Sequence, residues 1–263
     1  MLDLENPEES YFVGFFLADG NLHRQSRNRG RASIEIKSCD SYIIERFKEI
    51  IPVSSTISKR SRATNYSGGK EAEFTKISIY DLGFRDALVS LGIPEGKKSL
   101  NISEPNAPFI KKDFYRGIVD GDGSLGITGE GFPFLSLVTA SDEICKGFIR
   151  YIKELTGHTV KSSRNTRDGV YNISIYKEKA QKVSQDMYYS GCLSLPRKYS
   201  KSLDVGKWVR PSSMRRVTWS RKRWTEEEDE FLLGHTLEES VEELVRTFKS
   251  VQIRKIRLEK KNL

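Results

Sequence analysis

The chain contains 263 residues, of which 37% are hydrophobic, and this length suffices for two modest hydrophobic cores and a small additional domain. Lysine and arginine number 44 against 36 aspartates and glutamates, and the resulting net charge of +8 favours a polyanionic partner. The three cysteines lie far apart without a CxxC spacing, which argues against a disulfide framework and a zinc site. Because neither a targeting signal nor an apolar run of membrane-spanning length is present, we expect a soluble, intracellular protein without a membrane partner, in the cytoplasm of a prokaryotic or phage-infected host or in an organelle.

A glycine-punctuated motif of nine residues occurs near the N-terminus and again in the middle of the chain. It is FVGFFLADG at residues 12–20 and YRGIVDGDG at residues 115–123. Small residues recur three or four positions apart within each bulky run, which predicts two helices that pack closely through Gly14 and Gly117. The terminal glycines, Gly20 and Gly123, are predicted to end these helices in a left-handed backbone conformation.

The two copies share one acidic position, which is Asp19 in the first and Asp122 in the second. Asp120 is not shared, because Leu17 is its counterpart in the first copy. A carboxylate at the C-terminal end of a helix faces the negative pole of the helix dipole, which is unfavourable unless a cation is also present. The pair therefore predicts a metal site, and its hard oxygen ligands favour Mg²⁺ or another hard divalent cation such as Mn²⁺.

The paired motifs resemble those of LAGLIDADG homing endonucleases in their single-chain, two-repeat form, and the resemblance covers about the first 205 residues. It implies an α+β fold in which two pseudo-symmetric repeats place antiparallel DNA-binding sheets around a central pair of helices. It also implies a monomeric, site-specific endonuclease that uses divalent metal ions to cut both strands of a long, asymmetric double-stranded DNA target. The implied metal ligands are the carboxylates of Asp19 and Asp122 and the backbone carbonyls of Ala18 and Gly121.

The sequence after each motif repeats as well. Asp40 and Asp142 each begin a predicted helix, and Ile77–Tyr80 recurs as Ile173–Tyr176. Each repeat is thus predicted to contain a motif helix, a strand, an Asp-capped helix, two further strands and a closing helix. The first repeat holds six more residues between these landmarks, which we assign to a longer hairpin around residues 65–69.

Alternation with a period of two predicts sheets with isoleucines on one face and polar side chains on the other. The residues 135–139 fit either of two registers that differ by one residue. Such polar faces are often mere solvated surface, but in this family they read base edges, and nearby basic loops contact phosphates. The predicted DNA-contacting residues of the two repeats are Arg29, Arg31, Ser33, Glu35, Lys37, Lys59, Arg60, Arg62, Lys76, Ser78, Tyr80, Lys161, Arg164, Arg167, Asn172, Ser174 and Tyr176.

A lysine near the end of each repeat completes the predicted catalytic set. In the family a lysine of this region reaches the active site, and the resemblance assigns this role to Lys98 and Lys198, with Lys97 and Lys201 as alternatives. These lysines would polarise the attacking water or stabilise the pentavalent phosphate. The competing interpretation is an ordinary solvated lysine near a helix end.

The C-terminal segment has a different pattern. Thr225 and Glu228 form a predicted capping box at the start of a three-helix unit, whose second and third helices are predicted at 237–248 and 250–261. The sequence at 223–229 resembles the opening of Myb-like helix-turn-helix domains, although Val241 stands near the place of their second tryptophan. The resemblance assigns DNA contact to residues of the third helix, with protein interaction as the alternative: Gln252, Arg254 and Lys255.

The predicted domains are a first repeat at 1–100, a linker at 101–112, a second repeat at 113–205, a basic linker at 206–222 and a Myb-like domain at 223–263. Two other functions are compatible with this scaffold. One is an intron maturase, which is an RNA-binding splicing cofactor, and the other is a non-catalytic DNA-binding regulator. Neither requires an intact acidic pair, so the presence of both Asp19 and Asp122 favours cleavage.

Overall fold

The computed structural model of the chain describes residues 2–63, 71–212, 214 and 223–259. It separates into two compact units, Met1–Arg210 and Pro211–Leu263, and this division falls inside the predicted basic linker. The longer hairpin predicted around residues 65–69 lies outside the described residues. None of the described helices is both long and apolar enough to cross a lipid bilayer.

The first unit contains two repeats of similar element order. The first repeat consists of α1 (Pro7–Asp19), β1 (Gly20–Arg24), β2 (Gly30–Lys37), the 3-10 helix η1 (Ser38–Asp40), α2 (Tyr42–Ile50), β3 (Ser55–Ala63), β4 (Glu71–Ile79) and α3 (Leu82–Ser90). The second repeat consists of α4 (Lys111–Asp122), β5 (Gly123–Ile127), β6 (Pro133–Thr139), α5 (Asp142–Thr156), β7 (Tyr171–Tyr176), α6 (Glu178–Met187) and α7 (Pro196–Lys207). Each motif helix is followed by two strands, where one was predicted, because the residue after each motif aspartate begins a strand directly.

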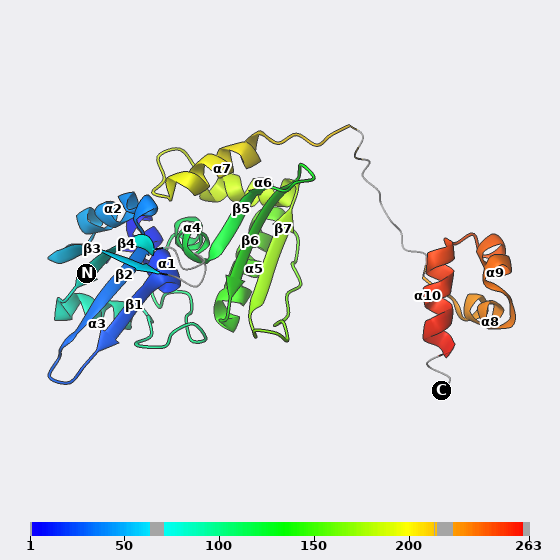
Figure 1. Ribbon diagram of the computed structural model, residues 1–263, viewed down its shortest axis with the longest axis horizontal. Coiled ribbons are helices and arrows are strands. Elements are labelled where there is room, and N and C mark those ends of the chain that lie inside the picture. The colour runs from blue at the N-terminus through cyan, green and yellow to red at the C-terminus, as the bar shows by residue number, and fades with distance from the viewer. Residues whose placement is uncertain (1, 64–70, 213, 215–222, 260–263) are drawn as a thin grey trace. The chain divides into compact units, whose positions relative to one another are not determined.

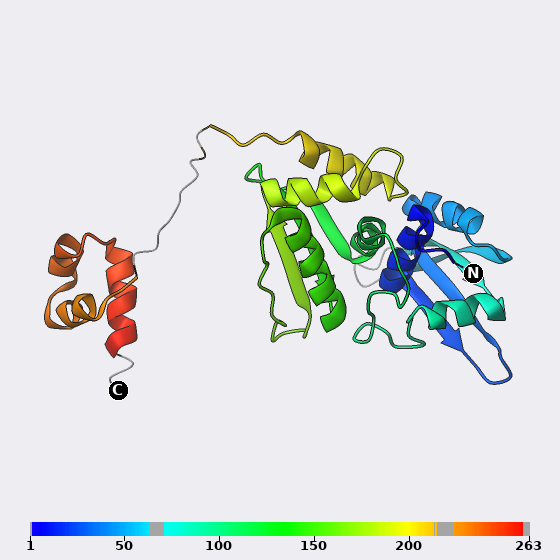
Figure 2. The same ribbon diagram turned by 180° about the vertical axis from the view of Figure 1, so that it is seen from behind.

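The two antiparallel sheets lie on either side of the α1–α4 helix pair (Figure 1). The first has four strands in the order β1-β2-β4-β3, and the second has three in the order β5-β6-β7. Seen from behind, α5 lies across one face of the second sheet (Figure 2). The ambiguous register of the second sheet is resolved, because Leu135 and Leu137 are buried while Val138 is exposed.

The motif helices pack through their glycines, as the motif periodicity predicted. A β-carbon at Gly14 would lie 2.0 Å from the carbonyl oxygen of Phe114, and one at Gly117 would lie 2.2 Å from the carbonyl oxygen of Tyr11. No side chain fits at these distances, so only glycine allows the two backbones to approach so closely. The predicted close packing of the motif helices is confirmed.

The terminal glycines of the motifs differ from the prediction. Gly20 has φ −77° and ψ 161°, and Gly123 has φ −103° and ψ 178°, so both are extended rather than left-handed. Each is the first residue of a strand that leaves the helix without a turn. Space accounts for these glycines instead, because a β-carbon at Gly20 would lie 2.5 Å from the carbonyl oxygen of Phe16.

The predicted aspartate caps are also wrong. The side chain of Ser141 caps α5 by accepting a hydrogen bond from the amide of Ile144, and Asp142 follows it in the first turn. In the first repeat, Asp40 ends η1 and accepts hydrogen bonds of 3.0 and 3.1 Å from Nε of Arg197 in the second repeat. Asp40 therefore joins the two repeats instead of capping a helix.

The second unit contains α8 (Glu226–Gly234), α9 (Leu237–Glu243) and α10 (Phe248–Glu259). The predicted capping box between Thr225 and Glu228 is present. The second helix is shorter than the predicted 237–248, because Val245 adopts a positive φ of 49° and breaks the helical path. The third helix consequently begins two residues before the predicted Ser250.

Candidate active site

Asp19 and Asp122 are the last residues of α1 and α4, and the packing of the two helices brings their carboxylate-bearing ends together. A β-carbon at Gly121 would lie 2.3 Å from Cβ of Ala18 and 3.2 Å from Oδ2 of Asp19. The small residues before each aspartate thus allow the first carboxylate to lie against the backbone of the other helix. Both aspartates keep exposed surface that a ligand can reach, although neighbouring atoms surround much of each carboxyl group.

The pKa values of the two carboxyl groups reflect this crowding. Burial among neighbouring atoms and the charge of Asp122 raise the pKa of Asp19 from 3.8 to about 6. Burial likewise raises the pKa of Asp122 above its ordinary value, although Lys98 and Lys198 oppose the shift. The ionised pair is therefore electrostatically disfavoured in the protein alone, and an additional cation between the carboxylates would relieve this cost.

Lys98 and Lys198 approach the two motif helices in the same way. The ammonium group of Lys98 donates hydrogen bonds to the carbonyl oxygens of Phe16 and Leu17, at 2.5 and 2.6 Å. That of Lys198 donates to the equivalent carbonyls of Val119 and Asp120, at 2.5 and 2.7 Å, and to that of Gly123 at 2.9 Å. Each lysine thus neutralises the negative pole of its helix beside the motif carboxylate.

Both ammonium groups are buried, and burial lowers the pKa of each lysine from 10.5 to about 8. The motif aspartates act in the opposite direction on Lys98, as do Asp120 and the motif aspartates on Lys198. The alternatives considered from the sequence, Lys97 and Lys201, have exposed side chains. Lys98 and Lys198 are therefore the matched pair that the fold brings to the motif carboxylates.

Asp120 is separated from this pair by its hydrogen bonds. Its carboxylate is buried and accepts hydrogen bonds from the hydroxyl groups of Tyr11 and Tyr188, each at 2.7 Å. It also accepts one of 2.8 Å from the amide of Leu195, the residue before α7. Because Lys198 lies in the first turn of α7, Asp120 anchors the helix that carries this lysine.

Small polar residues form a row across each sheet directly after the motif aspartates. In the first sheet the cross-strand partners are Asn21, Ser33, Ser78 and Thr56. In the second sheet they are Ser124, Ser136 and Ser174. Cross-strand partners project from the same face, so both rows present short side chains beside the motif carboxylates. Four members of these rows were not predicted from the sequence: Asn21, Thr56, Ser124 and Ser136. The spacing of 103 residues, which relates Asn21 to Ser124 and Ser33 to Ser136, is the signal that could have identified most of them.

The predicted DNA-contacting residues of the first repeat lie mostly at the surface. Ser33 and Ser78 are exceptions, with exposures of only 5% and 6%; both are short side chains on the two inner strands of the sheet. Glu35 and Lys76 are partly buried. The remaining members are exposed: Arg29, Arg31, Lys37, Lys59, Arg60, Arg62 and Tyr80.

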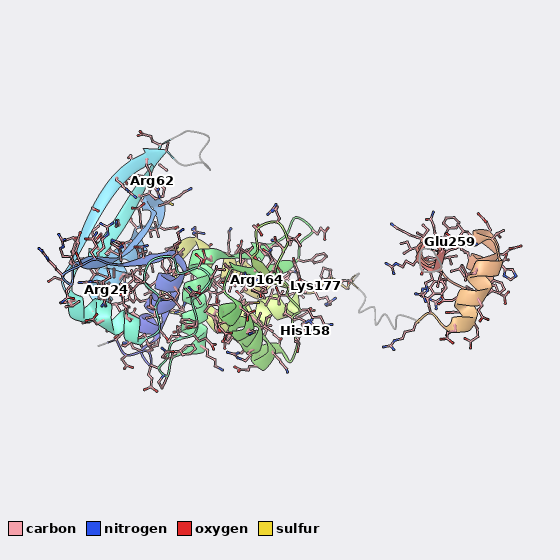
Figure 3. All side chains as sticks on the ribbon, turned by 90° about the horizontal axis from the view of Figure 1, so that it is seen from below. Arg24, Arg62, His158, Arg164, Lys177 and Glu259 are labelled. Carbon is pink, nitrogen blue, oxygen red and sulfur yellow. The ribbon has the colours of Figure 1, made fainter. Side chains whose placement is uncertain are left out.

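These residues do not form one uniformly basic face. Glu35 forms ion pairs with Arg60 at 2.7 Å and Arg62 at 3.1 Å, so part of the charge is neutralised within the sheet. Arg62 lies on the β3–β4 hairpin (Figure 3). Lys59 precedes Arg60 on β3, and successive residues of a strand project from opposite faces, so Lys59 lies on the face of its cross-strand partner Thr75.

In the second repeat, the exposed predicted residues are Lys161, Arg164, Arg167, Asn172 and Tyr176, and Ser174 is partly buried. Arg164, labelled in Figure 3, donates a hydrogen bond to the carbonyl of Gly169 and lies 4.9 Å from the ring centroid of Tyr171. Arg167 forms an exposed ion pair with Asp168. The two arginines therefore already have partners in the loop before β7 and at the first residue of that strand.

Two of the three residues predicted to read DNA from the C-terminal unit hold that unit together. Arg254 forms an ion pair with Asp229 of α8, in which its Nε donates a hydrogen bond of 2.7 Å. Lys255 donates a hydrogen bond of 2.6 Å to the carbonyl of His235. Gln252 is exposed on α10.

The donor set at the motif carboxylates is suited to a hard divalent cation. Within the described residues, no cluster of three or more histidine, cysteine, aspartate or glutamate side chains could hold a metal. Two accessible carboxylates remain, and Mg²⁺ commonly binds through one or two carboxylates while water and substrate phosphates complete its shell. The hydrogen bonds from the lysines go to carbonyls other than those of Ala18 and Gly121.

Comparisons with family models and with curated proteins yield no match. Among solved structures, the homing endonuclease I-WcaI bound to its DNA recognition sequence has a TM-score of 0.53 and 16% identity, with 77% of this chain and 88% of that chain covered. I-SmaMI, bound to uncleaved DNA target in the presence of calcium ions, has a TM-score of 0.50 and 14% identity, over 77% and 90% of the two chains. The LAGLIDADG homing endonuclease I-LtrWI, bound to target DNA, has a TM-score of 0.48 and 10% identity, over 78% and 89%. This chain therefore has the α+β fold of LAGLIDADG homing endonucleases, with antiparallel sheets around a central helix pair.

Proposed function

We propose that this chain is a monomeric, site-specific endonuclease that hydrolyses one phosphodiester in each strand of double-stranded DNA, with divalent metal ions held by Asp19 and Asp122. The observation that carries the proposal is the convergence of these two accessible carboxylates at the ends of paired helices, each with a buried lysine beside it. Two matched half-sites suit a substrate with two equivalent strands.

The chemistry follows from the charge of the substrate. A phosphodiester is anionic and resists attack by water, and bound Mg²⁺ or Mn²⁺ would supply charge neutralisation and an activated nucleophile. The chain itself would contribute the two carboxylates, with the carbonyls of Ala18 and Gly121 as further oxygen donors. The ammonium groups of Lys98 and Lys198 hold positive charge beside the site, where they would stabilise the additional negative charge of the pentavalent phosphate.

The surroundings of the carboxylates also suit a bulky duplex. The side chains in the polar rows beside Asp19 and Asp122 are serine, threonine and asparagine. In the first sheet they leave more room than the arginines and lysines farther along the strands. Hydroxyl and amide groups can accept or donate hydrogen bonds to base edges. The basic residues farther from the centre would contact phosphates on either side of the cut.

The decisive experiment combines an unbiased substrate with carboxylate variants. The purified chain should be incubated with a randomised library of DNA sites and Mg²⁺, and the cut ends should be sequenced. We expect double-strand breaks at one site, with no cleavage when EDTA replaces Mg²⁺. The selected site then serves as the substrate for all variants.

Asp19→Asn and Asp122→Asn should each lower the rate of double-strand cleavage by about 1000-fold, which corresponds to ~4 kcal/mol of transition-state stabilisation. DNA affinity in EDTA should change little, because a metal ligand rather than a phosphate contact is removed. Asp204→Asn is the matched control, since this aspartate is exposed on α7 outside the site. A wild-type rate of double-strand cleavage in either active-site variant would refute the proposed site.

A further inference from the structure

A cavity of about 570 Å³ lies in the first repeat, where the hairpin between β1 and β2 meets α3. Its lining is cationic and polar, and it includes no aspartate or glutamate: His23, Gln25, Asn28, Arg29, Gly30, Arg31, Tyr80 and Arg85. Three arginines thus line this cavity, and none of the described residues that line it is acidic. Such a cavity favours an anionic ligand.

Arg85 is the residue that makes this cavity more than a solvated basic surface. Its side chain is only 2% exposed, and its Nη2 donates hydrogen bonds to the carbonyls of Asn28 at 2.7 Å and Tyr80 at 3.4 Å. Its Nε and Nη1 are buried and have no hydrogen-bond partner among the described residues. A buried donor without an acceptor is costly, and the cost is greater for a charged group.

Nearby carboxylates are engaged elsewhere. Arg24, which lies on β1 (Figure 3), forms ion pairs with Asp86 and Glu95, both at 2.6 Å. Asp81 caps α3 by accepting a hydrogen bond from the amide of Phe84. Within the described part of the chain, no carboxylate forms an ion pair with Arg85.

Arg116, another deeply buried arginine of this unit, has a hydrogen-bond acceptor for each of its guanidinium nitrogens. Arg116 pairs with Asp113 at 2.5 Å and donates hydrogen bonds to the carbonyls of Leu193 and Met187, at 2.8 and 2.6 Å. All three of its nitrogen atoms have acceptors. Arg85 is similarly buried without the counter-charge, and the described residues supply no acceptor for its remaining donors.

The backbone at Gly30 packs closely against Arg85, which lines the cavity. Gly30 has φ +150°, and a β-carbon there would lie 2.8 Å from Nη1 of Arg85 and 2.2 Å from the carbonyl oxygen of His23. A larger residue at this position would press on the guanidinium. Gly30 is also the cross-strand partner of Arg24. Arg24 lies four residues along β1 from Gly20, the residue after Asp19, so this end of the hairpin is roughly 13 Å from the end of the motif helix.

We propose that this cavity binds a phosphate oxyanion, that Arg85 is its buried donor, and that in the DNA complex the anion is a backbone phosphate several base pairs from the cut. The identification of the anion as DNA phosphate rests on the proposed function, whereas the anion site itself does not. Arg29 and Arg31 at the rim of the cavity would contact the same or the adjacent phosphate.

The anion site is tested first without DNA and without divalent metal. Thermal unfolding of the full chain is followed in inorganic phosphate and in chloride of equal ionic strength, for the wild type, Arg85→Met and the control Arg46→Met. Arg46 is an arginine of α2 that pairs with Glu8 and Glu49 outside the cavity. We expect phosphate to raise the Tm of the wild type and of Arg46→Met, and to leave that of Arg85→Met unchanged, because a ligand stabilises only a state that binds it. Equal phosphate stabilisation of all three proteins would overturn the proposal.

Arg85→Lys provides a second variant that retains the charge. A lysine offers fewer and differently directed donors, so phosphate should stabilise this variant less than the wild type. If Arg85→Met does not fold, Arg85→Lys decides the question alone, and full phosphate stabilisation of Arg85→Lys would then refute a specific guanidinium site.

The DNA arm identifies the source of the phosphate. Affinity for the selected site is measured in EDTA at several salt concentrations, and Arg85→Met should reduce the slope of log affinity against log salt by about 0.9 relative to Arg46→Met. An Arg85-dependent phosphate effect with an unchanged DNA slope retains the anion site and overturns its assignment to DNA. Failure of the wild type to cleave any DNA refutes the proposed nuclease and leaves no selected site for the DNA arm, whereas the phosphate arm, which measures no cleavage, still decides the anion site.

Discussion

The two repeats of the first unit agree at their centre and differ toward their edges. Asp19 and Asp122, the carbonyl pairs bound by the two lysines, and the first two residues of each polar row are all related by the same spacing of 103 residues. The sheets differ, because one has four strands and the other has three. The proposed catalytic groups thus occur twice, whereas the two sheets proposed to read DNA are not copies, which suits the proposed asymmetric target.

The same lysine position is reached by different means in the two repeats. Lys98 lies in the segment after α3, whereas Lys198 lies in the first turn of α7. Asp120 anchors the start of α7, but its counterpart in the first repeat is Leu17, which is buried among apolar side chains. Equivalent positions of functional groups therefore do not require equivalent supporting contacts.

Among variants that test the similarity of the two repeats, we expect the largest effect at the contact between α1 and α4. Replacing Gly14 or Gly117 with leucine should prevent native folding, because even a β-carbon would overlap a backbone carbonyl of the other helix. Overpacking costs about 1–3 kcal/mol where side chains can shift, and a backbone clash should exceed that range. Urea unfolding would show similar destabilisation of both variants.

Gly129→Leu is the control for this experiment, since a β-carbon at Gly129 meets no atom within 4 Å. Its stability should remain close to that of the wild type. If the Gly14 and Gly117 variants were as stable as Gly129→Leu, the close approach of α1 and α4 would be disproved.

Exchanging the residues at the motif position that differs between the repeats, Leu17 and Asp120, should have the next largest effect. Asp120→Leu makes the second motif resemble the first, but it leaves two tyrosine hydroxyls and the amide of Leu195 without their acceptor. We expect the free energy of unfolding to fall by about 2–3 kcal/mol, because each unsatisfied buried group costs ~1–3 kcal/mol and the effects are not additive.

The reciprocal variant, Leu17→Asp, introduces a buried carboxylate among apolar side chains and should be destabilising as well. Recovery of wild-type stability by either exchange would show that the difference between the repeats at this position is neutral. Cleavage by Asp120→Leu on the selected DNA site would report in addition whether Lys198 keeps its position.

The sequence was sufficient to predict the central helix pair and the carboxylate pair, because both follow from a periodic motif that is repeated in register. It was not sufficient to predict the backbone conformation of Gly20 and Gly123. Glycine is required there because a carbonyl oxygen lies close by, and not because φ is positive. The burial of Ser33 and Ser78 also depends on strands that are distant in sequence.

Charged residues were the least predictable part of the sequence. Arg254 and Lys255 form a basic run on a helix, yet their partners are Asp229 and a carbonyl oxygen of the same unit. Arg85 looks like an ordinary surface residue of a helix until the β1–β2 hairpin folds against it. Local patterns do not distinguish a charge that binds a ligand from one that stabilises the fold.

The charged groups of the candidate active site should give the metal-free protein a specific pH dependence. The pKa of Asp19 is raised to about 6, so the folded protein binds more protons than the unfolded chain between about pH 4 and pH 6. Its contribution to stability is present below this window and is lost as the pH rises through it. Asp19→Asn should flatten the decline in Tm over this range, measured in EDTA.

The two lysines add the opposite slope at higher pH. Their pKa values are lowered from 10.5 to about 8, so the unfolded chain binds more protons between these values and stability should rise with pH there. Mg²⁺ at neutral pH should raise the Tm of the wild type by mass action, and that of Asp19→Asn by less. An equal effect of Mg²⁺ on both proteins would argue against metal binding at Asp19.

The smallest effect is expected from removal of the C-terminal unit, which has no counterpart in either repeat. Truncation after Lys207, the last residue of α7, should leave a folded and catalytically competent core, because every proposed metal ligand precedes this residue. We expect weaker binding and a footprint that shortens on one side only, since the removed unit occurs once. The slope of log affinity against log salt should fall by roughly 0.9 for each phosphate that the truncated chain can no longer reach. Because Arg254 and Lys255 are already paired within the unit, this change should be small.

Identical footprints and salt slopes for the full and truncated chains would show that the unit does not touch DNA, which would leave interaction with another protein as the better explanation for its presence.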